Sequence, residues 1–428
     1  MKRFATAALA ALAAAAAFAA REQISSIQLA PVEKLTQSIV KFFDACGNSA
    51  FGPMVAMGVA GGETTNCCGT SRWVFSVDPV DCKNTLEIFD TIEKKSEKAA
   101  ALPNGVCIRV VLEKKAMDLA VKSLEEIKDT EDCKELCSGD SEELVAYLKG
   151  CNGAKLDIAF GDGGLSFDFE IDSPELAAKA AESPFKGGNP LAFAKGHPVL
   201  AVASVKGAGR GAMDVWKRFS EALAKRNIKT TGFVKASIDQ DGNERFDLDV
   251  KAAIGYFKGE GEKAVEEAFE SDSFLDEMRA AMSGGKSEKP EVRAAFYVKG
   301  IESGETAANA FSRILPESAG KPVAQACVAN YYEFLKCVAA SMKESGDKNA
   351  KMLESILPVL PETGGSGIAA MCWSEGGKLQ ILTRITPVEL RGFGMGISAA
   401  MAASAAHGIQ QGDKSGESAP AAGLDDDE

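Results

Sequence analysis

Histidine is almost absent from this chain, because only His197 and His407 occur among its 428 residues. A metal site that needs several histidines is therefore excluded. Catalysis by a Ser/His/Asp or Cys/His arrangement would depend on His197 alone, since His407 borders a tail predicted to be disordered. The motifs G-x-S-x-G, H-E-x-x-H and C-x-x-C are also missing. These absences argue against the commonest hydrolase and thiol-redox chemistries.

Positive charge is in deficit, with 48 Lys and Arg residues against 61 Asp and Glu residues and a formal net charge of −13. Such a surface repels nucleic acid and anionic membranes, and no basic cluster with interleaved aromatic residues offsets it. We therefore expect no nucleic-acid partner. After the N-terminal segment no apolar run is long enough for a membrane-spanning helix, so the mature chain is expected to have no transmembrane segment.

The first residues have the pattern of a signal peptide. Lys2 and Arg3 give a basic start, an Ala/Leu run interrupted only by Thr6 follows from Ala5 to Ala16, and Ala17-Phe18-Ala19 supplies an A-x-A cleavage site. This pattern predicts removal of residues 1–19 and export to the periplasm or the cell exterior.

Cysteines are concentrated near the N-terminus, where eight of the eleven lie between positions 46 and 151. An exported protein meets an oxidising environment, so these residues are disulfide candidates, although their pairing stays open. An odd total leaves at least one thiol free or intermolecular, and some cysteines would be small buried hydrophobic residues instead. The candidates are Cys46, Cys67, Cys68, Cys82, Cys107, Cys133, Cys137 and Cys151.

The clearest structural pattern runs from position 367 to 406. Two strands flank a Gly-Gly turn, and the second strand, 378–385, alternates apolar and polar residues, as expected when one face is buried. A helix then begins with Thr386 as N-cap, Pro387 at the first helical position and Glu389 completing a capping box. Similar strand–turn–strand–helix units begin near positions 53, 154 and 230.

A strand and one or more helices separate successive units, so the chain reads ββα followed by three βα-ββα segments. This is the order of a ferredoxin-like split βαβ fold. We therefore predict an α+β fold of repeated modules, with antiparallel sheets and helices mainly on one face. The expected parts are a signal peptide at 1–19, a Cys-rich α+β domain at 20–188, α+β modules at 189–287 and 288–407, and a disordered acidic tail at 408–428.

Three local predictions concern the Cys-rich domain at 20–188 and the α+β module at 288–407. The pattern predicts a strand at 54–59, a helix from 78 to about 101, and a long helix over 322–343 that would hold both Cys327 and Cys337.

One stretch resembles a dinucleotide-binding turn. Gly207 to Ala212 fits G-x-G-x-x-A between an apolar strand and a helix, and Asp239 ends the next strand, where a ribose-binding acid would lie. That next strand turns directly into an antiparallel hairpin, which favours a flexible strand-to-helix turn instead. We expect no cofactor, and the candidates for such a site are Gly207, Gly209, Ala212 and Asp239.

Acidic residues also recur on predicted strands. Asp239-Gln240-Asp241-Gly242-Asn243 is explained by a hairpin turn better than by a calcium loop, because its glycine comes too early for an EF-hand. Asp168 and Glu170, like Asp247 and Asp249, alternate on wet strand faces, where solvated surface explains them better than a glycosidase-like acid pair. We assign no metal ligand and no catalytic residue.

Three functional hypotheses follow. The leading one is an exported, non-catalytic binding or envelope-associated structural component, with an unknown protein or small-molecule partner. The second is a carrier that holds an apolar ligand between sheet and helices, favoured by a cavity near Phe160, Phe167 and Phe169. The third is a secreted hydrolase that uses two carboxylates from different units.

Overall fold

The computed structural model describes residues 22–391. The exceptions are 48, 63–66, 78–91, 128–144, 147, 183–184, 186–187, 206–210, 270, 272, 275–276, 279–290, 302–303, 348–349 and 352–364. The expected signal peptide and acidic tail therefore lie outside the described residues.

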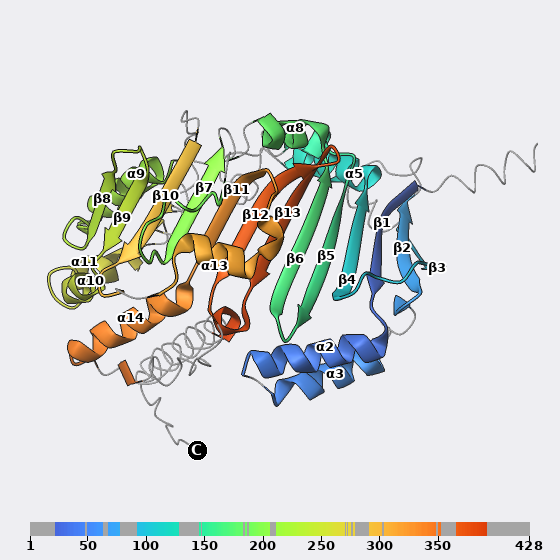
Figure 1. Cartoon of the computed structure of the whole chain (residues 1–428), viewed down its shortest axis with the longest axis horizontal. Coiled ribbons are helices and arrows are strands. Elements are labelled where there is room, and N and C mark those ends of the chain that lie inside the picture. The colour runs from blue at the N-terminus through green and yellow to red at the C-terminus, as the bar shows by residue number, and fades with distance from the viewer. Residues whose placement is uncertain are drawn as a thin grey trace, which may run out of the picture.

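A single sheet of thirteen strands runs through the molecule (Figure 1). The strands are β1 (Glu22–Leu29), β2 (Ser71–Val77), β3 (Glu93–Lys98), β4 (Val106–Glu113), β5 (Gly153–Gly161), β6 (Gly164–Asp172), β7 (Leu200–Val205), β8 (Val234–Ile238), β9 (Glu244–Leu248), β10 (Glu291–Val298), β11 (Val323–Ala329), β12 (Ile368–Glu375) and β13 (Lys378–Ile385). Their spatial order is β3-β2-β1-β4-β5-β6-β13-β12-β11-β7-β10-β9-β8. Among the described neighbours β9 and β10 pair in parallel and the others are antiparallel, so the expected mixture of helices with antiparallel strands is confirmed.

Helices cover both faces of this sheet. Phe311 of α13 (Ala307–Ile314) packs on Ala201 and Ala369. On the other face α9 (Ala212–Lys225) lies over Val202, which points the opposite way from Ala201 on β7. In Figure 1, α13 crosses in front of the sheet, while α2 and α3 lie at one end of its strands. The described helices are α2 (Val32–Ala45), α3 (Phe51–Gly61), α5 (Lys114–Ile127), α8 (Pro174–Glu182), α9 (Ala212–Lys225), α10 (Val250–Phe257), α11 (Glu262–Phe269), α13 (Ala307–Ile314), the 3₁₀ turn η2 (Pro316–Ser318) and α14 (Tyr331–Glu344).

The sheet has two halves of corresponding strand order. The order β2-β1-β4-β5-β6 in the first half corresponds to β10-β7-β11-β12-β13 in the second, and the halves meet where β6 pairs with β13. Leu165 pairs with Ile385 and Ile171 pairs with Leu379, so the register is symmetric about the pair formed by Asp168 and Leu382. A local two-fold axis therefore passes beside that pair.

Three predicted elements are wrong. Residues 54–59 are not a strand but part of α3, which is apolar on every side and so has no period of two to identify it. The predicted helix over 322–343 is split at Asn330 into β11 and α14, because the small residues of β11 fit between two neighbouring strands. Residues 93–98, predicted as the end of a helix, form the edge strand β3, which pairs with β2 and places Lys94 over the Trp73 ring at 4.1 Å.

The end of the last unit also differs from the capping box that the sequence predicts. The Thr386 hydroxyl accepts a hydrogen bond from the Gly367 N–H at 2.9 Å, and a carboxylate oxygen of Glu389 accepts one from the Tyr332 N–H at 3.3 Å. Glu389 is fully buried, and this burial raises the pKa of its carboxyl group to about 7. Glu389 thus joins the helical turn at 387–391 to the start of α14.

We predict that Glu389→Gln changes the pH dependence of stability. The folded-state pKa lies above the ordinary value of 4.5, so the wild type loses up to about 3 kcal/mol as pH rises from about 4.5 to 7, when the buried group must ionise. Gln avoids this cost. The melting temperature of the variant relative to wild type should therefore be higher at pH 8 than at pH 5, measured by circular dichroism.

The matched control is Glu175→Gln, which removes the acid near the start of α8, where the side chain is 61% exposed. A Glu389→Gln effect of equal size at both pH values would contradict the prediction.

Candidate functional site

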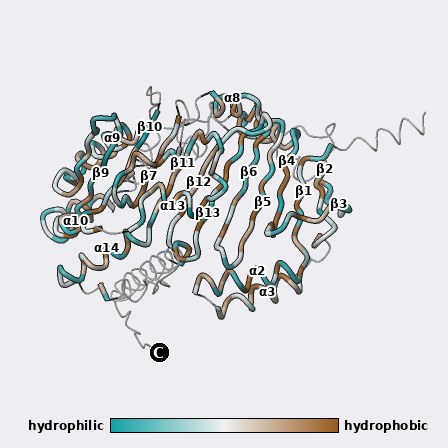
Figure 2. Tube along the Cα trace, in the orientation of Figure 1, coloured by the Kyte–Doolittle hydropathy of each residue, from teal (hydrophilic) through white to brown (hydrophobic). Residues whose placement is uncertain are grey.

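The two faces of the central strands differ in polarity. On β6, Phe167 and Phe169 point to one side and Asp168 and Glu170 to the other, which appears as alternating colours along the strand in Figure 2. Neighbouring strands keep this register, since Phe169 pairs with Leu156 on β5 and with Ile381 on β13. We call the side that carries Phe169 the apolar face and the side that carries Glu170 the charged face.

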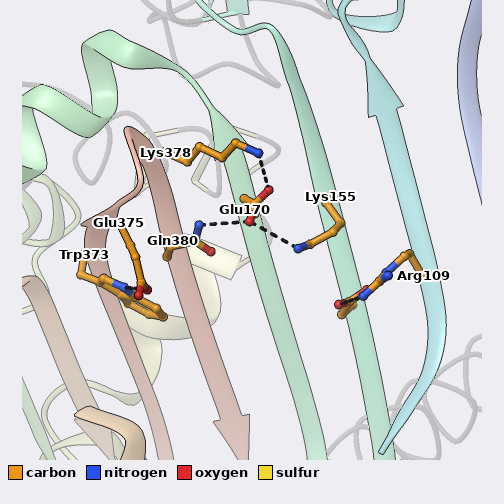
Figure 3. Close-up of polar contacts among 8 residues, drawn as sticks. Arg109, Lys155, Glu170, Trp373, Glu375, Lys378 and Gln380 are labelled. Atoms are coloured by element: carbon orange, nitrogen blue, oxygen red, sulfur yellow. Dashed lines mark hydrogen bonds and ion pairs between the residues drawn. The ribbon is translucent and has the colours of Figure 1, made fainter. Parts of the chain in front are cut away.

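Ion pairs and hydrogen bonds hold the charges of the charged face (Figure 3). Arg109 donates to both carboxylate oxygens of Asp157 at 2.6 Å. Glu170 accepts hydrogen bonds from Lys378 at 2.8 Å, Gln380 at 3.2 Å and Lys155 at 3.3 Å. The hydrogen bond from Lys378 is the main cause that lowers the pKa of Glu170 to about 2. The Glu170 carboxylate is therefore held by three hydrogen-bond donors of neighbouring strands.

The acid pair that the sequence singled out therefore lies on open sheet. Asp168 is exposed, and neither Asp168 nor Glu170 lines the cavity beneath α9 or the two cavities beside β8, β9 and β10. This geometry fits a solvated charged surface.

A cavity of about 680 Å³ lies on the apolar face, between α9 and the strands of the second half. Its volume is within the range of small-molecule sites, roughly 300–1,000 Å³. None of the described residues that line it is charged, and the hydroxyl of Ser204 and the amide of Gln325 are their main polar groups. The lining residues are Leu200, Val202, Ala203, Ser204, Ala212, Val215, Trp216, Phe219, Val292, Ala294, Phe296, Gln325, Ala326, Cys327, Ala370, Met371, Cys372 and Ile381.

Helix α9 forms the roof of this apolar cavity. Ala212, Val215, Trp216 and Phe219 have the i, i+3, i+4, i+7 spacing of one helix face. Small side chains on the strands beneath α9, such as Ala294 and Ala370, leave this space unfilled.

Two contacts fix the roof near β9 and β10. The carboxylate of Glu244, only 1% exposed, accepts a hydrogen bond from the Met213 N–H at 2.8 Å and so binds the helix N-terminus. Trp216 meets Phe246 edge-on at 6.2 Å, and Phe246 stacks on Phe296 at 4.4 Å. The helix is thus anchored at one side of the cavity, while half-buried Cys327 and Cys372 line the other side.

Both of these thiols are protonated at neutral pH. Burial raises the pKa of Cys327, and it raises the pKa of Cys372 to about 11. A protonated thiol is a poor nucleophile, so the lining offers apolar contact and no reactive group. The arrangement can bind an apolar molecule, and its described lining residues include no group suited to acid–base or nucleophilic catalysis.

The cavity is not the one that the sequence suggested. Phe160, Phe167 and Phe169 lie on the same apolar face but outside the lining, and Phe160 contacts Phe42 of α2 at a ring distance of 6.0 Å.

The dinucleotide-site candidates are dispersed. Gly207 and Gly209 lie outside the described residues, and Ala212 lines the apolar cavity. Asp239 holds the β8–β9 turn, because its carboxylate accepts the N–H groups of Asp241 at 2.9 Å and Asn243 at 2.8 Å. The N-terminus of α9, where a phosphate would bind, is occupied by Glu244.

Disulfide pairing does not occur among the described cysteines: no two of them are bonded to each other. Of the candidates, Cys46, Cys67, Cys68, Cys107 and Cys151 are described, and Cys82, Cys133 and Cys137 lie outside the described residues. Cys67 and Cys107 pack in one apolar cluster with Leu29 and Leu35, as small hydrophobic residues would.

Sequence reasoning missed the lining of the apolar cavity. The apolar positions of α9 can be recognised from its sequence. The floor of the cavity joins residues of β7, β10, β11 and β12, and no pattern within a single strand shows that these strands become neighbours.

In the described part of the chain, no helix combines the length and hydrophobicity needed to cross a bilayer. No cluster of three or more described His, Cys, Asp or Glu residues could hold a metal ion. Comparison with protein-family models, curated proteins and solved structures found no match to this chain.

We predict that Glu170→Gln makes acid unfolding less steep. The lowered pKa of Glu170 gives stability that is fully present above about pH 4.5 and is lost as pH falls toward 2, when the carboxylate must take up a proton. Removing the charge removes that dependence. Melting curves at pH 7, 4 and 3 should show a smaller loss for the variant than for wild type, and Glu33→Gln on the exposed side of α2 should follow wild type. An unchanged slope for Glu170→Gln would contradict the prediction.

Proposed function

We propose that this protein is a non-catalytic carrier that binds an apolar small molecule in the cavity beneath α9. The supporting observation is a space of about 680 Å³ in which none of the described lining residues is charged. Burial of apolar ligand surface contributes about 25 cal/mol per Å², so a ligand that buries about 300 Å² would gain about 7 kcal/mol before the costs of binding. That gain is enough for a useful affinity without any ion pair.

The carrier hypothesis is better supported than the two alternatives. A purely structural component has no need for an apolar cavity of this size beneath a well-anchored helix. A carboxylate-dependent hydrolase needs two converging acids in a cleft, whereas Asp168 is exposed on the open charged face and Glu170 is bound to Lys378.

Export is part of the proposal. The basic start at Lys2 and Arg3, the Ala/Leu run and the A-x-A site support delivery to the periplasm or the exterior.

The corresponding strand order of the two sheet halves suggests an internal duplication. We propose that β4 to α8 and β11 to the turn at 387–391 are copies of one βα-ββα module. Their corresponding strand order and the two-fold register of β6 with β13 favour a duplication.

We predict that filling the apolar cavity abolishes ligand binding. Ala370 lies in the lining between Cys327 and Thr383, so a phenyl ring at that position would occupy the space. N-phenyl-1-naphthylamine, an uncharged fluorophore, should show a saturable fluorescence rise with wild type, and Ala370→Phe should weaken binding about tenfold or more.

The matched control is Ala154→Phe, which adds the same ring on the same apolar face but outside the lining. It should bind as wild type does. The proposal is wrong if wild type does not bind the probe, or if both variants lose binding equally.

We also predict that the bound probe protects the cavity thiols. At pH 9 iodoacetamide should alkylate Cys372 slowly, because its pKa is about 11. Saturating N-phenyl-1-naphthylamine should slow the alkylation of Cys327 and Cys372 further, while Cys46, which lies beyond the lining, keeps its rate. Peptide mass spectrometry measures each site, and equal rates with and without probe at the two lining thiols would contradict binding at this location.

A further inference from the structure

A second binding region lies on the opposite side of the sheet from the apolar cavity. Two cavities, of about 500 and 730 Å³, occur where β8, β9 and β10 form a corner of the sheet. Lys195, Arg245 and Tyr297 line both of them, so the two spaces adjoin. Arg245 precedes Phe246 on β9 and therefore points away from the apolar cavity. We call the joined space the polar groove.

One wall of the polar groove is the segment 188–197, which is held firmly. The Asn189 amide donates hydrogen bonds to the Ala308 carbonyl at 2.8 Å and to the Ser312 hydroxyl at 3.0 Å, both on α13. The fully buried Leu191 and its neighbour Ala194 belong to the core cluster beneath that helix. The wall is therefore fixed before any ligand arrives, which lowers the ordering cost of binding.

The opposite wall is equally constrained. The β8–β9 turn is closed by Asp239, which accepts hydrogen bonds from the Asp241 and Asn243 N–H groups and from the Asn243 amide at 2.9 Å. Asp239, Asp241 and Asn243 all line the 500 Å³ cavity.

The charges of the polar groove nearly cancel. Arg245 donates to Asp247 through Nε at 2.9 Å and Nη2 at 2.7 Å, and Lys299 contacts Asp249 at 2.8 Å. Buried Glu244 reaches the groove too, but its carboxylate binds the start of α9. The cations of the lining are Lys195, Lys235, Arg245, Arg293 and Lys299, and its other acids are Asp239, Asp241, Asp247 and Asp249.

Paired charges select a particular ligand chemistry. A guanidinium has five N–H donors and a carboxylate has several lone pairs, so the Arg245–Asp247 pair keeps donors and acceptors available side by side. A strongly charged ligand would have to compete with these pairs. A hydroxyl group donates and accepts at once, so a neutral ligand rich in hydroxyls fits this floor without breaking any pair.

Aromatic rings add flat apolar surface to the polar groove. The Arg245 guanidinium lies 3.9 Å from the centre of the half-buried Tyr297 ring, and Phe185 and Phe193 line the space from the side of the fixed wall. Sugar rings present C–H faces that pack on such surfaces and hydroxyl edges that bond to planar polar side chains. The two adjoining cavities give room for more than one ring.

We propose that the polar groove binds a neutral oligosaccharide, with the Arg245–Asp247 pair as its central hydrogen-bonding group and Tyr297 beside it. This site is separate from the apolar cavity, and the proposal for each site can be tested without the other.

The test is calorimetric titration of the full chain with three neutral hexasaccharides: maltohexaose, cellohexaose and N-acetylchitohexaose. At least one should bind wild type, and Arg245→Gln should weaken that binding about tenfold or more, because the side chain loses its charge and several donors. Arg109→Gln is the matched control. It breaks the bidentate Arg109–Asp157 pair on the same charged face, outside the groove, and should leave binding unchanged.

Three results would overturn the proposal: no heat of binding from any of the three sugars, equal binding by wild type and Arg245→Gln, or tighter binding of a charged hexamer of galacturonate or glucosamine. Circular dichroism verifies the fold of each variant. If Arg245→Gln does not fold, Asp247→Asn replaces it, since this change keeps the side-chain shape, and the same tenfold loss is required.

Discussion

The pairing of β6 with β13 is the constraint on which the rest of the molecule depends. It joins strands more than 200 positions apart in sequence and closes what would otherwise be an exposed edge on each half of the sheet. It also sets which residues share a face, because a slip of one strand by one position would put Phe169 and Ile381 on opposite faces of the sheet. The ion pair between Glu170 and Lys378 crosses this junction and favours the observed register.

That register separates two kinds of surface. On the charged face Lys378 and Gln380 of the second half donate hydrogen bonds to Glu170 of the first half. Leu382, which pairs with Asp168 on the same face, is buried in the core cluster under α13. On the apolar face the same strands present a continuous row of aromatic and aliphatic side chains, which only a helix or a ligand can shield from water. Helix α9 shields part of this row, but Glu244 and Phe246 fix it over β9 and β10, and the small residues of β7, β11 and β12 leave a space beneath it.

An element of the fold could be predicted from the sequence where its own residues determine its structure. The hairpins β5–β6 and β12–β13 were predictable, because glycine-rich turns and the alternation of apolar and polar residues in β5, β6 and most of β13 specify them within about twenty residues. β11 was mistaken for helix because its Ala-rich sequence suits both states, and only its two neighbouring strands decide between them. α3 was mistaken for strand because it is apolar on all sides, so its sequence carries no period.

The sites were less predictable than the fold for a related reason. The lining of the apolar cavity joins Val202, Cys327 and Cys372, whose alignment depends on which strands become neighbours. Glycine spacing suggested a phosphate site at the start of α9, yet a buried glutamate from 31 positions away occupies that helix end. The glycine motif indicates that the backbone could bind a phosphate. It gives no information about a distant side chain, such as Glu244, that binds a backbone N–H of the same helix end in the folded protein.

Strand β9 shows how one short element can serve both faces. Its Phe246 packs against Trp216 and Phe296, two residues that line the apolar cavity. Arg245 and Asp247, one position to either side, line the polar groove. The backbone of β9 is hydrogen-bonded to β8 on one side and to β10 on the other, so it resists the displacement that would couple the two sites. A ligand on one face can influence the other face only by moving this paired backbone. Successive residues of a strand point to opposite faces, so β9 contributes to the apolar cavity on one face and to the polar groove on the other. Each of the two surfaces can therefore select its own ligand.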